Sequence, residues 1–478
     1  MPWMRAILSV ARCLPRQLTL VSPNACAATV ACRVVALCRE PSRWHGPPRQ
    51  LTPASPAAHT AAAACHAVSR SRHAASPSAC GNTAVELASL AASPLHLALT
   101  VLHASLLYCT NGRTPKRRRH DGEQVNPDAL AQAARADAER SASGGRCAVG
   151  LHGVPVLLKD NIATRDRLNT TAGSLALLGS VVRRDAGVVT RLRRAVAVIL
   201  GKGNPSEWSN YRPVDSGWSA RGGQTLNPYV LSVTPCGSET LGSETDVSIL
   251  CPSSLNSVVG IKPTVGLTSR SGVIPITPLQ DTFGYIRDAV HVLDVIVGYD
   301  ELDDEATGAA SKYIPHGGFT QFLRIQGLKA KRIGVLDVFF QGYDDMQLAV
   351  IAFNEAHPVE ERLKDFGQPD LIAAEKTNDI GTRERAAIQR LKEISTNGLE
   401  KLMKEHQLDA IVAPNSDASS VLAVGGYPGI AVPAGYDRQG VPFAICFGGL
   451  KGYEPRLIEI AYAFEQATKV RRPPSFRR

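Results

Sequence analysis

Two features of this sequence could carry out chemistry: a lysine after an apolar run, and a long stretch rich in serine and glycine. Lys159 directly follows the apolar residues 154–158, and the serine- and glycine-rich stretch extends from 216 to 272. A partly buried lysine has a lowered pKa, so it can accept the proton of a serine hydroxyl. Tight backbone turns supply free N–H groups that stabilise an oxyanion. This combination suggests a serine–lysine hydrolase.

The remaining motifs disfavour several other classes of chemistry. Beyond residue 120 the sequence holds four well-separated cysteines and neither a CxxC pair nor an HExxH helix face, so we expect no zinc site and no disulfide framework. We interpret Cys236 as a packing residue. The glycine patterns of dinucleotide-binding and phosphate-binding loops are incomplete around Gly201, so we expect no cofactor. His152 and the Ser219 segment lack the pattern of a Ser-His-Asp hydrolase.

Helices and strands must position these residues, and the sequence predicts that they alternate. Asn126-Pro127-Asp128 is typical of a helix start, and Asp185 is expected to cap a second helix. Short, continuous apolar runs are typical of strands covered on both faces. The alternation predicts an α/β fold with a mixed, mostly parallel central sheet flanked by helices. The predicted strands are 154–158, 196–200 and 409–413, and the later helices are 288–297, 383–405 with a break near Gly398, and 454–466.

The first 120 residues differ in composition from residues 121–478. They hold 14 Lys and Arg against two acids, and seven of the 11 cysteines, whereas the rest holds 39 basic and 41 acidic residues. This arginine-rich, acid-poor segment is typical of an organellar transit segment for mitochondria or plastids. The alternative is a largely disordered low-complexity stretch on an otherwise cytoplasmic protein. The apolar residues 84–109 include an acid, a proline and two histidines, which argue against a membrane span.

The sequence from about Val125 to Phe464 resembles the amidase signature family, whose members hydrolyse carboxylic amides with a Ser–cis-Ser–Lys triad. The resemblance implies the fold of that family, a small-molecule amide as substrate, and no cofactor. A net charge near −2 in the body supplies no general attraction for nucleic acid. The matching segments, in the order of the family, are 153–161, 170–174, 185–189 through 200–202, 219–224, 244–249, 260–264, 428–435 and 461–465.

The resemblance also implies the site residues. Lys159 matches the triad lysine, Ser248 the nucleophile that forms an acyl-enzyme, and Ser238 the bridging serine whose hydroxyl lies between them. The backbone N–H groups of Thr245, Asp246, Val247 and Ser248 would form the oxyanion hole. Each such donor typically contributes about 100- to 1000-fold in rate.

Several positions depart from the family pattern. Ser238 and Ser248 are 10 positions apart, less than half the usual separation, so we expect a strand and a helix of the central sheet to be absent around residues 239–242. A second shortening is expected between Phe340 and Ala352. Val247 replaces a family glycine, and a β-branched residue resists a positive φ.

Three functions stay open at this point. The first is a working amidase, and the second is a non-catalytic amidase-like protein. The third is a protein whose basic N-terminal segment binds nucleic acid or a membrane. Within the family, the amidase-like subunit of a glutamine-dependent tRNA amidotransferase is the alternative to a free-standing amidase.

Overall fold

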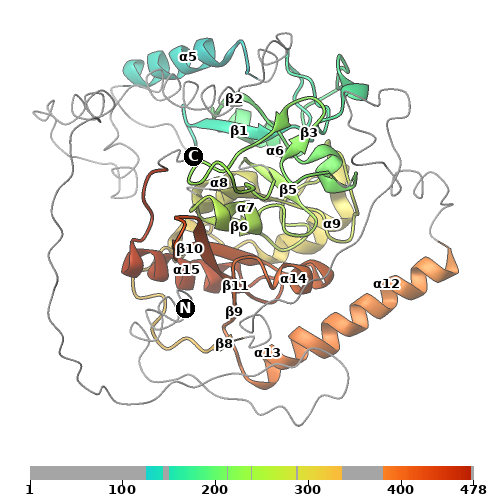
Figure 1. Cartoon of the computed structure of the whole chain (residues 1–478), viewed down its shortest axis with the longest axis vertical. Helices are drawn as coiled ribbons and strands as arrows, with labels where there is room; N and C mark the ends of the chain where they lie inside the picture. Colours follow the sequence, from blue (N-terminus) through green and yellow to red (C-terminus); the bar gives the residue numbers. More distant parts are fainter. Residues whose placement is uncertain are drawn as a thin grey trace, which may run out of the picture. The chain divides into compact units, whose positions relative to one another are not determined.

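A seven-stranded sheet is the largest sheet of the protein (Figure 1). The structure is a computed structural model that describes residues 125–143, 150–212, 214–237, 240–286, 289–335 and 381–474. All of these belong to one compact unit, and the second unit, residues 38–92, lies outside the described residues. The strands, in spatial order, are β5 (Gly242–Glu244), β7 (Thr282–Ile286), β6 (Gly260–Lys262), β10 (Gly429–Tyr436), β11 (Pro442–Gly448), β9 (Ala410–Pro414) and β8 (Ile333–Val335).

The strand directions contradict the prediction of a mostly parallel sheet. Five of the six neighbouring pairs are antiparallel, and only β8 and β9 pair in parallel. The prediction is wrong because alternation of helix and strand along the chain does not fix which strands are neighbours. A tight turn joins β10 to β11, with Asp437 N donating to the Val441 carbonyl at 2.9 Å. Loop residues 263–281 join β6 to β7 without a helix.

Side-chain alternation divides the core between the two faces of this sheet. Ile430 and Val432 of β10 pack in one cluster with α15 (Glu454–Thr468), whereas Ala431 packs in another with α7 (Leu250–Leu255) and α14 (Ser419–Gly425). This is the period of two expected for a strand covered on both sides. Across the first cluster the rings of Phe447 and Phe464 lie edge to face at 5.8 Å.

A separate two-stranded parallel sheet carries the predicted lysine. It consists of β1 (Pro155–Lys159) and β2 (Val198–Gly203), and it packs in a cluster with α6 (Gly187–Arg194) and α8 (Ala289–Ile296). Asn126 connects the preceding helix, α5 (Ala129–Ala142), to this sheet, because its Nδ2 donates to the Ile199 carbonyl at 2.7 Å. A parallel bridge between Leu158 and Leu241 continues from β1 towards β5. The smaller elements are β3 (Trp218–Ser219), β4 (Gly223–Gln224) and α9 (Asp304–Ala310).

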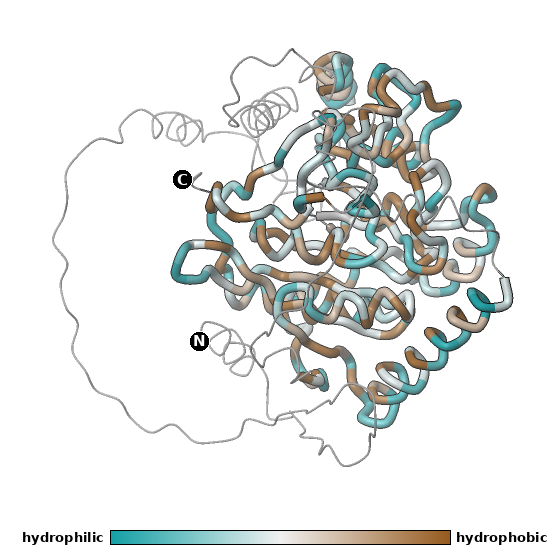
Figure 2. Tube along the Cα trace, turned by 45° about the vertical axis from the view of Figure 1, so that its right-hand side comes forward, coloured by the Kyte–Doolittle hydropathy of each residue, from teal (hydrophilic) through white to brown (hydrophobic). Residues whose placement is uncertain are grey.

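Most predicted helices agree with the structure within about two residues. The helix predicted to break near Gly398 is α12 (Thr382–Ser395), a π-helical segment Thr396–Glu400 and α13 (Lys401–Glu405). Figure 2 shows apolar, brown positions recurring along α12 among hydrophilic, teal ones. The predicted capping role of Asp185 is wrong: α6 begins after Ala186, and the Asp185 carboxylate instead accepts from Arg193 Nε at 3.0 Å. A carboxylate can serve a side chain as readily as a helix end, and sequence alone does not separate the two.

Three predictions lie outside the described residues: the transit segment, the apolar residues 84–109, and the shortening between Phe340 and Ala352. Within the described ranges, no helix is both long and apolar enough to cross a membrane.

Candidate active site

Lys159 ends β1, and its amine is buried against β5. The residue is 3% exposed. Its Nζ lies 3.2 Å from the carbonyl oxygen of Ser243 and 3.5 Å from Ser243 Oγ. Burial disfavours the ammonium form and lowers the pKa of Lys159 to about 8, although the carboxylates of Glu244 and Asp281 oppose the shift. At pH 7 about one-tenth of the molecules then hold the neutral amine, the form that can accept a proton.

The serine beside this amine is Ser243, which the sequence prediction missed. β5 lies next to the end of β1 because Lys159 N donates to the Leu241 carbonyl at 2.9 Å. Asn161 Nδ2 donates to Ser243 Oγ at 2.7 Å. Gly242 allows the lysine stem to pass close to the backbone, since a Cβ at that position would lie 3.1 Å from Lys159 Cδ. Two strand ends therefore place an amine, an amide and a hydroxyl together in a buried position.

Ser248 lies in the turn between β5 and α7. Its Oγ donates to the Asp246 carbonyl at 3.5 Å, and its N–H donates to the same oxygen at 2.9 Å. Among the described residues, Lys159 Nζ makes its hydrogen bonds with Ser243 and none with Ser248. Ser238 lies outside the described residues, and its bridging role stays a prediction.

The backbone amides predicted to form the oxyanion hole follow β5 directly. Val247 N donates to Ser419 Oγ at 2.7 Å, so this amide already has an acceptor in the present conformation. The same hydroxyl also donates to the Asp246 carboxylate. On the other side of the turn, Thr245 Oγ1 donates to Asp281 Oδ1 at 2.5 Å. Neighbouring elements therefore hold this turn from both sides.

Glu244 anchors the start of α7. Its Oε2 accepts from the N–H groups of Ile249 at 2.5 Å and Leu250 at 2.9 Å. Burial raises the pKa of Glu244 to about 7, against the opposing effect of the Lys262 ammonium. The carboxylate of Glu244 therefore already occupies these two amides at the start of α7.

Val247 has a left-handed backbone conformation, with φ of 62°. A β-branched side chain resists a positive φ, as expected from the sequence, and this position does require one. A non-glycine residue in this conformation costs about 1–2 kcal/mol. The turn that carries Ser248 is therefore strained at the residue before the serine.

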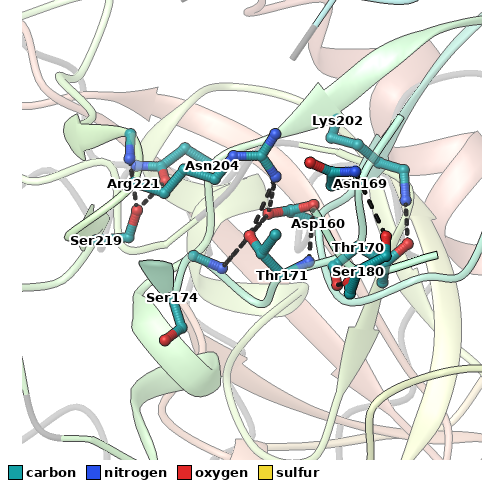
Figure 3. Close-up of polar contacts among 12 residues, drawn as sticks. Asp160, Asn169, Thr170, Thr171, Ser174, Ser180, Lys202, Asn204, Ser219 and Arg221 are labelled. Carbon is teal, nitrogen blue, oxygen red and sulfur yellow. Dashed lines mark hydrogen bonds and ion pairs between the residues drawn. The ribbon is translucent and has the colours of Figure 1, made fainter. Parts of the chain in front are cut away.

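A buried polar network begins at the residue after Lys159 (Figure 3). Asp160 Oδ2 accepts from Arg221 Nη1 at 3.0 Å, and these side chains are 1% and 3% exposed. The same oxygen accepts from the Thr171 hydroxyl and from Gly173 N. The carboxylate therefore joins the end of β1 to two other segments of the chain, the loop 171–173 and Arg221.

Lys202 belongs to the same network and lies on the neighbouring strand β2. Its Nζ donates to the Ile162 carbonyl and, at 3.0 Å, to Thr170 Oγ1. Burial lowers the pKa of Lys202 to about 8, opposed chiefly by Asp160. Both acceptors of Lys202 lie in the loop that follows β1, whereas Lys159 contacts a serine of β5.

Comparison with known proteins identifies this architecture. A family model described as Amidase matches residues 123–367. The chain is also 50% identical over 430 residues to a protein of Arabidopsis thaliana named "Probable amidase", covering 74% of this chain and 84% of that protein. The chain belongs to the amidase family.

Two further relatives place this amidase within the family. The crystal structure of the peptide amidase from Stenotrophomonas maltophilia is 34% identical, with a TM-score of 0.68, covering 83% of this chain and 98% of that chain. A glutamyl-tRNA(Gln) amidotransferase subunit of a Cyanothece strain is 28% identical over 440 residues, covering 71% of this chain and 89% of that protein. The amidotransferase alternative is thus less favoured than a free-standing amidase.

A disulfide closes the serine-bearing segment of this amidase, contrary to the prediction. Cys236 is bonded to Cys251, with Cα atoms 5.8 Å apart and a sequence separation of 15. The expectation of a packing role for Cys236 is wrong because β5 and the following turn bring the two residues together. Asn256 of the same region also donates to the Pro235 carbonyl at 3.0 Å. The chain between the cysteines contains Ser243 and Ser248.

A cavity of about 570 Å³ lies beside α12 and α14. Its lining includes Tyr313, Lys392, Glu400, Tyr427 and Lys451, and it does not include Lys159, Ser243 or Ser248. The cavity is therefore separate from the predicted site residues that the structure describes. Within the part of the chain that the structure describes, no group of three or more His, Cys, Asp or Glu is arranged to hold a metal ion.

Proposed function

We propose that this protein hydrolyses the C–N bond of a carboxylic amide through an acyl-enzyme, with Ser248 as nucleophile and Lys159 as base. One observation carries the proposal: Lys159 is a buried amine with a pKa lowered to about 8, within hydrogen-bonding distance of a serine on the strand that leads to Ser248. Lys202 is buried with a similar pKa, so the serine contact, and not burial alone, distinguishes Lys159.

The reaction would proceed in two steps. The neutral amine of Lys159 takes the proton that Ser248 loses as its Oγ attacks the carbonyl carbon, and the same proton then passes to the leaving amine. Water, activated by the same base, releases the carboxylic acid from the acyl-enzyme. Thr245, Asp246 and Val247 would supply the backbone donors for the oxyanion. The Val247 amide would have to exchange its bond with Ser419 for one with the substrate.

The relatives support a proposal for the substrate class. A peptide amidase matches 83% of this chain at 34% identity, so we infer a small, peptide-like carboxylic amide as substrate. Membrane and nucleic acid are not part of the proposed reaction.

A fluorophosphonate probe tests the function, because it reacts with activated serines. Purified protein should be labelled at Ser248, and Lys159→Ala should lose the label. Ser271→Ala is the matched control, since its buried Oγ has no hydrogen-bond partner among the described residues and lies outside the proposed site. Absence of label on protein that is folded by circular dichroism would contradict a working amidase and favour the non-catalytic alternative.

A further inference from the structure

A disulfide closes a ring of chain around the turn that carries Ser248. Cys236 and Cys251 are bonded across a sequence separation of 15. Both cysteines are partly exposed, so a dissolved thiol can reach the bond. A disulfide that a thiol can reach is more readily reduced than a buried one. The bond is therefore open to reduction in the folded protein.

The closed ring contains two residues with a left-handed backbone conformation that are not glycine. Cys236 has a φ of 61° and Val247 a φ of 62°. A Cβ disfavours this conformation, and a β-branched side chain disfavours it most. Cys251 N also donates to the Val247 carbonyl at 2.9 Å, which links the disulfide to the residue before Ser248. Opening the ring removes a covalent restraint from both strained residues.

With the disulfide closed, the turn is not arranged for attack on a substrate. The Val247 amide is bonded to Ser419 Oγ at 2.7 Å, and Ser248 Oγ donates to the Asp246 carbonyl at 3.5 Å. Among the described residues, the Lys159 amine makes no hydrogen bond with Ser248. The predicted nucleophile and one predicted oxyanion donor are therefore both bonded to other groups in the oxidised protein.

We propose that Cys236 and Cys251 form a redox-modification site, and that its reduction by a dithiol releases the turn and activates Ser248. The disulfide form is the less reactive state, and the reduced form is the more reactive one. The gain in reactivity of Ser248 rests on the proposed amidase function, whereas the redox chemistry of the cysteine pair does not.

The electrons and protons balance in two exchange steps. A thiolate of the dithiol attacks one sulfur of the pair, which breaks the bond between Cys236 and Cys251 and forms a mixed disulfide. The second thiol of the reductant then closes the reductant's own disulfide and releases the protein thiol. The protein gains the two electrons and two protons that the reductant loses, so no other co-reactant is needed.

Two hydrogen bonds hold the neighbouring chain segments together without the disulfide. Asn256 Nδ2 donates to the Pro235 carbonyl at 3.0 Å, and Asn227 Nδ2 donates to the Leu255 carbonyl at 2.8 Å. Neither bond involves a cysteine, and both asparagines are buried. The reduced thiols therefore stay near each other, so the disulfide can form again and the modification is reversible.

Labelling rates test the proposal in the full-length protein. Fluorophosphonate labelling of Ser248 should be about tenfold faster after reduction with dithiothreitol, the factor expected when the strain of one residue is relieved. Cys236→Ser/Cys251→Ser should be labelled at the faster rate with or without dithiothreitol. Equal rates in oxidised and reduced protein, or a double variant that still responds to dithiothreitol, would overturn the inference.

Cys446→Ala is the matched control, because Cys446 is a free, buried cysteine outside the ring. This variant should keep the full response to dithiothreitol. The double variant in turn keeps the other nine of the 11 cysteines, so it separates the ring from every other thiol of the chain. Loss of the response in Cys446→Ala would contradict the assignment to the ring.

Two measurements without any turnover provide the second readout. After equilibration with reduced and oxidised dithiothreitol, alkylation and peptide mass spectrometry should show Cys236 and Cys251 becoming reactive together and reversibly. Amide hydrogen exchange across residues 244–250 should be faster in the reduced protein. If no serine is labelled in either state but both results hold, the amidase proposal fails while the redox site stands. A pair that stays oxidised in excess dithiothreitol, or an unchanged exchange rate, overturns the inference.

Discussion

The network around Asp160 and the turn that carries Ser248 differ in how completely their polar groups are matched. In the network, the Asp160 carboxylate is surrounded by an arginine, a threonine and backbone donors, and Lys202 has two fixed acceptors. In the turn, Val247 has a positive φ, its amide is bonded to a side chain, and Ser248 makes one long hydroxyl bond.

We therefore assign a structural role to the network around Asp160 and the proposed chemistry to the turn that carries Ser248. The network follows β1 and fixes the loop beside Lys159, so the proposed base keeps its place even if the turn changes. Any defect in catalysis is therefore expected in residues 237–250 and not in the network. Substitutions and pH changes in the two regions test this division, from the largest expected effect to the smallest.

Replacing the base should have the largest effect. Lys159→Met is expected to lower amide hydrolysis by about 100- to 10,000-fold, the usual contribution of a general base. It should also raise stability by up to about 3 kcal/mol at pH 7, because the folded chain no longer buries an amine with a depressed pKa. Between pH 8 and 10.5 the unfolded chain binds more protons than the folded one, so the gain should shrink as the pH rises. Urea unfolding at pH 7 and pH 10 measures this, and a loss of stability at pH 7 would contradict it.

Removing the anion of the network should act on the fold. Asp160→Ala leaves Arg221 buried without its carboxylate, which costs about 3–5 kcal/mol. The double variant Asp160→Ala/Arg221→Ala should recover part of this loss, because no unpaired charge stays buried. Urea unfolding of the double variant and of both single variants measures the coupling energy. If the stability losses of the two single variants add up to the loss of the double variant, the ion pair does not stabilise the network.

Opening the disulfide should affect the turn. Cys251→Ser is expected to lower stability by about 3 kcal/mol, the value for a closed loop of this size. Cys236→Ser/Cys251→Ser should lose no more than the single variant, since both break the same bond. Thermal unfolding with and without dithiothreitol checks the result, and alkylation of both cysteines in the folded, non-reduced protein would refute the pairing.

The pH dependence follows from the lowered pKa of Lys159. Only the neutral amine acts as base, so kcat/KM should rise from pH 6 with an inflection near pH 8 and then level off. The rate at pH 7 should be about tenfold below the plateau. A profile that is flat between pH 6 and 9 would show that Lys159 is not the base.

Restoring glycine should have the smallest effect. Val247→Gly removes the strain of a positive φ and should change stability by about 1 kcal/mol or less, since glycine also adds entropy to the unfolded chain. Labelling of Ser248 should become faster, because the amide before it can reorient. Val247→Ala is the control: it keeps a Cβ, so equal gains in both variants would exclude the conformational explanation.

Local patterns made much of this molecule predictable. The ends of β1 and α15, and the break at Gly398, depend on apolar periodicity and on glycine, which act within a few residues. The role of Lys159 as base, in contrast, depends on the resemblance to the amidase signature family, because a lysine after a strand is more often a surface charge.

Strand pairing could not be predicted in the same way, because it joins residues far apart in the chain. The antiparallel order of the sheet, the pairing of Cys236 with Cys251, and the contact of Ser243 with Lys159 all depend on how β5 is placed. The sequence offered one signal, because Leu241 and Ser243 are two positions apart and so lie on the same face of a strand. If Leu241 pairs with β1, Ser243 can face Lys159 at the end of β1.

The two buried lysines on neighbouring strands also have a calorimetric consequence. Lys159 and Lys202 titrate near 8 in the folded protein, whereas an unfolded lysine titrates near 10.4. At pH 9, these two lysines together should therefore take up roughly two protons from the buffer on unfolding, and Lys262, whose pKa burial also lowers, adds to the uptake. The measured heat of unfolding should then differ between borate and Tris, because each proton taken up adds the ionisation enthalpy of the buffer that releases it.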